Sequence, residues 1–187
     1  MGINTFMNIS DFYKPVDIEN LAEIQQEVLK LVPTSLLNRT TLTYIEKHKE
    51  IFLGSAALSD FLKSKKMYDS VGAIAVNVTV GKGAGNYHVD SGPFKHSLNI
   101  PIIGCENTWI NFFKVNSDYT IVKVENQGKT HQFFRYTEDQ CELIYEAETS
   151  KPYLLGVKTP HRVVNNSDQT RIMILVRLFP GPWLETI

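Results

Sequence analysis

The sequence has no long apolar run of the kind that crosses a membrane. None of its apolar stretches approaches the ~18 consecutive residues that a spanning helix requires. Met1 and Gly2 open the chain without a signal peptide, and Phe6 stands where a myristoylation pattern needs Ser or Thr. These absences lead us to expect no membrane partner and a soluble, cytoplasmic protein.

Cysteine is scarce, and neither sign of charge dominates. The two cysteines, Cys105 and Cys141, are too far apart for a zinc pattern, and we expect both to remain thiols in a reducing compartment. The 19 basic and 20 acidic residues are interspersed and give a formal net charge of -1. The sequence therefore shows no clear patch for nucleic acid or for anionic lipid.

Internal repeats and low-complexity segments are also missing. The 187 residues, 43% of them hydrophobic, suffice for one substantial core and are too few for two sizeable domains. We expect a single domain over 1–187, in which a mostly helical part over 1–68 packs on a β-rich core over 69–180.

Two amphipathic helices are predicted in the first part of the chain. After Asp17, a plausible N-cap, apolar residues recur at helical spacing and stop before Pro33. A second helix is predicted from Ser55 to Met67, with lysines near its C-terminal end, where cations oppose the helix dipole. The segment 40–52 between them is ambiguous.

The remainder of the chain is predicted to be β-rich. Residues 71–80 are β-branched and almost continuously apolar, which indicates a buried strand. Further strands are predicted at 96–103, 107–114, 118–124, 130–136, 141–147, 152–157, 161–165 and 170–179. Helices followed by short, evenly spaced strands favour helices packed on the outside of a β-sandwich or barrel.

The residues that carry chemistry begin with His88 and Asp90. In an extended strand the side chains alternate, so these two point to the same face. His161 opens another short apolar run near the far end, and a second histidine would complete a 2-His-1-carboxylate triad for a divalent first-row metal. Ten residues later, Arg171 heads the next apolar run. A cation beside a metal triad implies an anionic cosubstrate.

This order of motifs, with the strand Ser97–Ile102 after the first two ligands, resembles the Fe(II)/2-oxoglutarate-dependent dioxygenase superfamily. The likeness extends to small phage and marine bacterial members and, more distantly, to aspartyl and prolyl hydroxylases. It covers roughly Val71 to Leu178. The fold that the resemblance implies is a double-stranded β-helix, the cupin-like form of the jelly roll.

The resemblance also implies roles for particular residues. His88, Asp90 and His161 would hold Fe(II) and be catalytic, with 2-oxoglutarate chelated through its keto-acid end and O2 at the last position. Arg171 would bind the distal carboxylate of 2-oxoglutarate. Asn99, an amide expected on an inward strand face, is a further candidate to contact a bound acid. The expected activity is hydroxylation of a small molecule or side chain, coupled to decarboxylation of 2-oxoglutarate to succinate.

A hairpin would bring Arg171 close to the metal. If His161 and Arg171 both face the interior on adjacent antiparallel strands, the loop between the strands must contain an odd number of residues. Pairing Val164 with Thr170 gives a five-residue loop over 165–169 and sets Arg171 opposite Val163. The hypothesis places Arg171 one strand away from the metal ligand.

Three other features of the sequence carry expectations of their own. The segment Gly81–Gly85 lacks the spacing of a phosphate-binding loop and is predicted to be a flexible connection. His96, six residues after Asp90, is placed where it could hydrogen-bond a ligand, and Asn111 is expected on an inward strand face.

Two other functions are consistent with the same residues. One is a metal-dependent jelly-roll enzyme that does not use 2-oxoglutarate, in which Arg171 binds the substrate itself. The other is a β-sandwich binding module in which His88 and Asp90 are incidental. Succinate formation separates the first alternative from the oxygenase, and metal analysis separates the second.

Overall fold

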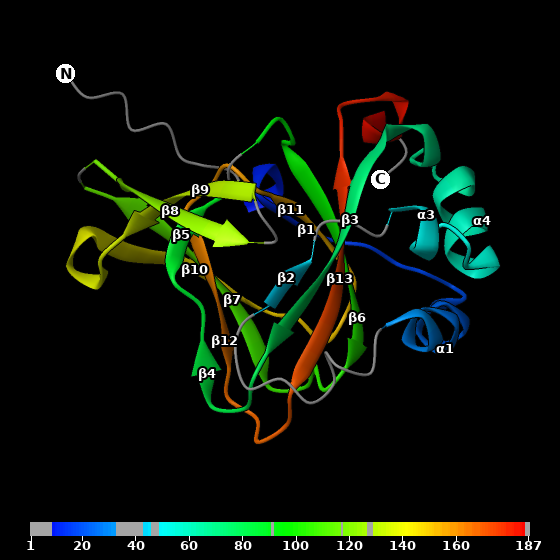
Figure 1. The fold of residues 1–187 in the computed structure, drawn as a ribbon, viewed down its shortest axis with the longest axis horizontal. Helices are drawn as coiled ribbons and strands as arrows, with labels where there is room; N and C mark the ends of the chain where they lie inside the picture. The colour runs from blue at the N-terminus through cyan, green and yellow to red at the C-terminus, as the bar shows by residue number, and fades with distance from the viewer. Residues whose placement is uncertain are drawn as a thin grey trace.

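Two antiparallel β-sheets face each other, and helices cover the outer face of one of them (Figure 1). The computed structural model describes residues 9–32, 43–45, 49–90, 92–116, 118–126 and 129–185. The expected fold class, mainly β with flanking N-terminal helices in a double-stranded β-helix, is confirmed.

The first sheet has six strands and the second has seven. In spatial order, the first contains β1 (Tyr13–Pro15), β11 (Tyr153–Gly156), β6 (His96–Ile103), β13 (Arg171–Leu178), β3 (Val71–Thr79) and β2 (Thr43–Ile45). The second contains β10 (Cys141–Glu148), β7 (Thr108–Val115), β12 (His161–Asn165), β5 (Tyr87–Val89), β9 (Lys129–Tyr136) and β8 (Thr120–Asn126), while β4 (Gly83–Ala84) pairs with β12.

The helices are α1 (Leu21–Leu31), α3 (Lys49–Phe52) and α4 (Ala56–Ser64). Short 3-10 turns occur at Ile9–Asp11, Tyr68–Ser70, Glu138–Gln140 and Pro182–Glu185. Helix α4 begins as predicted, because the Ser55 side chain accepts a hydrogen bond from the Leu58 N–H. The expected cap at Asp17 is wrong: α1 starts later, with Asn20 as N-cap. The ambiguous segment contains β2 and α3.

Strand β13 divides the core in two. All eight of its residues are buried, because it lies in the middle of the first sheet between β6 and β3. Ile172, Ile174 and Val176 face the helices and join their apolar cluster. Alternation then turns Arg171, Met173, Leu175 and Arg177 towards the second sheet. Two arginines are therefore buried between the sheets.

The predicted hairpin between the last two long strands is wrong. β12 belongs to the second sheet and β13 to the first, so the segment between them crosses from one sheet to the other. Arg171 lies opposite Thr79 on β3, not opposite Val163. The physical reason is burial: the apolar run of β13 needs cover on both faces, which a central strand beneath the helices provides.

The glycine-rich segment before the motif contains β4, so part of this predicted connection pairs with the sheet. Ala84 pairs with Val164, and the Gly85 N–H donates to the Val163 carbonyl over 2.7 Å. Lys82 Nζ donates to the Asn166 carbonyl over 2.8 Å. These bonds hold the approach to β5 against β12.

Candidate metal centre

His88, Asp90 and His161 meet at one end of the space between the sheets. His88 on β5 lies directly opposite His161 on β12, and the centroids of the two rings are 4.5 Å apart. Asp90 comes immediately after the last residue of β5. One ligand atom from each of the three side chains lies within 4.8 Å of the others, so a single ion could contact all three.

The backbone fixes the orientation of both imidazoles. His88 Nδ1 lies 2.8 Å from the Asn86 carbonyl, and His161 Nδ1 lies 2.8 Å from the Thr159 carbonyl. In a neutral ring, each hydrogen bond places the proton on Nδ1 and leaves the lone pair on Nε2. His88 Nε2 is 3.4 Å from Asp90 Oδ1, so the free nitrogen and the carboxylate face the same space.

Asp90 is held as a carboxylate by a partner on the other sheet. Arg177 Nη1 forms an ion pair with Asp90 Oδ2, and the two side chains are only 7% and 14% exposed. Burial tends to raise the pKa of Asp90, but Arg177 and the hydrogen bond with His88 outweigh it and hold this pKa well below its usual range. One carboxylate oxygen is thus engaged by Arg177, and the other faces His88.

The pKa values of the two histidines shift in opposite directions. Burial, aided by the neighbouring His88, lowers the pKa of His161 to about 4. Burial also acts to lower the pKa of His88, but its hydrogen bond with Asp90 and the charge of that carboxylate outweigh burial and raise the pKa. At neutral pH His161 is therefore neutral, the form in which an imidazole binds a metal ion.

Arg171 reaches the interior from the first sheet. It is 1% exposed, and its Nη1 donates to Asn77 Oδ1 over 2.6 Å. Its Nη2 donates to Met173 Sδ over 2.9 Å, so the side chain runs along β13 towards the end that carries Arg177. In the described part of the chain, no carboxylate pairs with Arg171 and no acceptor meets its buried Nε. A buried guanidinium without a counter-charge is a place for an anion.

Two further polar side chains share this interior. Asn99 is 2% exposed and accepts a hydrogen bond from Ser97 Oγ over 2.6 Å. Tyr153 lies directly opposite Asn99 on β11 and is fully buried. Burial raises the pKa of Tyr153, while Arg171 and Asn99 partly oppose the rise, so the phenol stays neutral beside both. The structure therefore places Arg171 and Asn99 together between the sheets.

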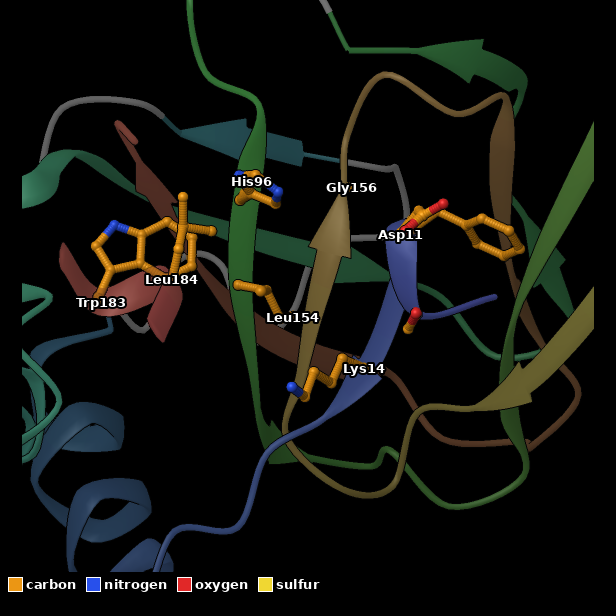
Figure 2. A pocket seen from close by; sticks show the side chains of 9 residues that line it. Asp11, Lys14, His96, Leu154, Gly156, Trp183 and Leu184 are labelled. Carbon is orange, nitrogen blue, oxygen red and sulfur yellow. The ribbon is translucent and has the colours of Figure 1, made fainter. Parts of the chain in front are cut away.

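Other sequence candidates lie away from this centre. His96 is on the opposite face of β6 from Asn99, and its ring centroid is 5.3 Å from that of Trp183. His96, Trp183 and Leu154 are among the residues that line a separate hollow of about 280 Å³. Figure 2 shows these side chains around it. Asn111 lies beside Phe112, whose side chain is in the inner core, so Asn111 points outwards. Neither His96 nor Asn111 faces the three candidate ligands, and for Asn111 this corrects the expected inward strand face.

Sequence reasoning missed Arg177 and Tyr153. The signal for Arg177 was a charged residue within an apolar strand, six positions after Arg171 and hence on the same face. Tyr153 lay in a predicted strand, but its pairing with Asn99 depends on sheet order that local patterns do not encode.

Comparison with known proteins gives no family. No protein-family model matches the chain, and no curated protein matches it. Among solved structures, the non-haem α-ketoglutarate-dependent carbocyclase SnoK from nogalamycin biosynthesis is similar over 91% of this chain and 81% of its own, at 9% identity and TM-score 0.47. The epimerase SnoN from the same biosynthesis, also described as non-haem and α-ketoglutarate-dependent, matches over 89% and 78%, at 13% identity and TM-score 0.47.

The non-haem monooxygenase ThoJ, in a nickel complex, matches over 88% of this chain and 72% of its own, at 12% identity and TM-score 0.40. Likeness at these scores shows no function for this chain. Among the described helices, none is long and apolar enough to cross a membrane.

Proposed function

We propose that this protein is an Fe(II)- and 2-oxoglutarate-dependent oxygenase, and specifically a hydroxylase. The observation that supports it most is the pairing of two sites between the sheets. Three side chains with the donor set of a facial triad lie within reach of one ion, and a buried guanidinium without a counter-charge lies farther along β13.

The donor atoms fit a first-row divalent metal. His88 and His161 each present Nε2 because Nδ1 is bound to a backbone carbonyl, and Asp90 presents Oδ1. Three protein ligands leave coordination positions for a chelating keto acid and for O2. A bound Fe(II) would supply activation of O2 and oxidation of a C–H bond, coupled to decarboxylation of 2-oxoglutarate to succinate.

The residues of the chain would position the reactants. Arg171 offers its unpartnered Nε and a rigid, planar set of donors to the distal carboxylate of 2-oxoglutarate. Asn99 and the neutral Tyr153 hydroxyl lie close enough to Arg171 to contribute hydrogen bonds to the same group. Arg177 holds Asp90 by the oxygen that faces away from His88, which fixes the carboxylate for metal binding.

An anaerobic titration of the Fe(II)-loaded protein with 2-oxoglutarate tests the proposal. We expect a weak visible charge-transfer band that saturates at one equivalent of 2-oxoglutarate per protein, followed by succinate formation when O2 is admitted. His161→Ala should abolish the band. If Fe(II) binds and no band or succinate appears, the protein does not use 2-oxoglutarate.

A further inference from the structure

An arginine on the strand beside His88 has no role in the chemistry above. Arg135 on β9 lies directly opposite His88 on β5 and opposite Thr120 on β8. Residues directly opposite in an antiparallel pair project to the same face, with Cβ atoms ~4.5–5.5 Å apart. The face of His88 is the one that carries the candidate metal ligands, so Arg135 projects beside that centre.

Arg135 is a half-buried residue. Within the described residues, none of the hydrogen bonds or ion pairs includes it. It differs in this from Arg177, which is paired with Asp90, and from Arg162, which stacks over the Tyr87 ring at 4.4 Å on the opposite face of the sheet. Figure 1 shows β8 and β9 extending from the barrel next to β5. Arg135 lies on β9 at the position that pairs with His88.

The charged groups around the candidate metal centre favour binding of an anion. Asp90 is an acidic side chain that acts on both candidate histidine ligands, and Arg177 already neutralises it. Lys158 adds a second cation beside Asp90. Its Nζ donates to the Asp90 carbonyl over 2.9 Å and to the Gly92 carbonyl over 2.8 Å. A divalent metal would make this region more positive still, and 2-oxoglutarate would use Arg171 for its distal charge. The region therefore attracts a further anionic group.

We infer that the substrate is a small acid, whose carboxylate or phosphate group is bound by Arg135 at the entrance to the metal centre. The inference rests on the proposed function. Arginine matches both groups through two parallel charge-assisted hydrogen bonds. A nucleic acid fits less well, because the chain has a net charge of -1 and Asp118 and Glu138 lie close to the aromatic residues on the other face of the same strands.

A matched pair of probes tests the inference without knowledge of the substrate. The protein is loaded with Zn(II), which is redox-inert, and with N-oxalylglycine, an analogue that occupies the 2-oxoglutarate site. Benzoate and benzamide, which share shape and differ in charge, are then titrated by calorimetry. We expect benzoate to bind at least about tenfold more tightly than benzamide, as one charge-assisted contact predicts.

Substitutions test whether Arg135 causes the preference for benzoate over benzamide. Arg135→Gln should bind benzoate and benzamide equally, and Arg135→Lys should keep part of the preference because it retains charge and loses the planar fork. Lys123→Gln is the matched control, since Lys123 is an exposed cation on β8 three residues from Thr120 and thus on the opposite face of that strand. It should behave like the wild type.

Two results would overturn the inference: a wild-type protein without a preference for benzoate, or a preference that persists in Arg135→Gln. A short thymidine oligonucleotide that binds more tightly than benzoate through Arg135 would replace the small acid by nucleic acid. Failure of the proposed function is seen separately, as absence of N-oxalylglycine binding in the Zn(II)-loaded wild type.

Discussion

Replacing Arg177 by methionine should destabilise the metal-free protein strongly. The substitution keeps an apolar chain of similar length but leaves the Asp90 carboxylate in place without the cation on Oδ2. Because the two side chains are only 7% and 14% exposed, solvent screens the pair little. Removing one partner of a buried ion pair costs about 3–5 kcal/mol, since the other charge stays buried and uncompensated. For a chain of this size that corresponds to a fall in Tm of roughly 10 °C.

Thermal and urea unfolding of four proteins would measure the effect: the wild type, Arg177→Met, Asp90→Asn and the double variant. The reasoning requires strong coupling, so that Arg177→Met costs far less once Asp90 has lost its charge. Lys158→Met is the matched control. Lys158 contacts only backbone carbonyls there and is exposed, so its loss should cost under about 1 kcal/mol. Equal costs of Arg177→Met in the wild-type and Asp90→Asn backgrounds would refute the ion-pair argument.

Three further predictions concern the candidate ligands and Arg171. His88→Ala or His161→Ala should abolish binding of one equivalent of Zn(II) while circular dichroism keeps its β-rich form; Zn(II) binding that persists would exclude the residue as a ligand. Arg171→Ala should weaken 2-oxoglutarate binding about 10- to 100-fold, as expected for loss of one or two hydrogen bonds to a charged group, with Arg171→Lys intermediate and metal binding unchanged. An unchanged Kd would remove Arg171 from the site. In the metal-free protein the pKa of His161 is about 4, against 6.5 in the unfolded chain. Because the unfolded chain binds this proton more readily, the contribution of His161 to stability is fully present above pH 6.5. It amounts to about 3 kcal/mol and is lost as the pH falls towards 4. Urea unfolding at pH 7 and pH 5 should therefore show a smaller loss for His161→Gln than for the wild type, and an equal loss would contradict the lowered pKa.

The strands were predictable from local pattern, since most of them are bounded by turn residues and bury at least one face. The prediction 96–103 matches β6 and 161–165 matches β12, and 170–179 differs from β13 by one residue at each end. The short strands β1 and β4 were missed, because each has three residues or fewer and depends on a partner strand for its identity.

The candidate metal centre was predictable in composition and only partly in geometry. Alternation placed His88 and Asp90 on one face, and the structure brings His161 opposite His88. The hairpin argument for Arg171 used the same alternation and chose the wrong neighbour. Alternation specifies the face of a strand, whereas the sheet that the strand joins depends on burial of its other face.

The same distinction separates Arg177 from Arg135, the two arginines that the sequence did not single out. Arg171 and Arg177 are an even number of residues apart on one strand, so assigning Arg171 to the interior already assigned Arg177 to it. A second buried cation requires an anion, and in the structure Asp90 from the motif supplies it across the two sheets. Arg135 is different. Its face depends on the register of β9 against β5, two strands distant in the sequence whose pairing no local pattern fixes. A residue proposed to bind the substrate can therefore remain hidden in a sequence whose candidate metal ligands are evident.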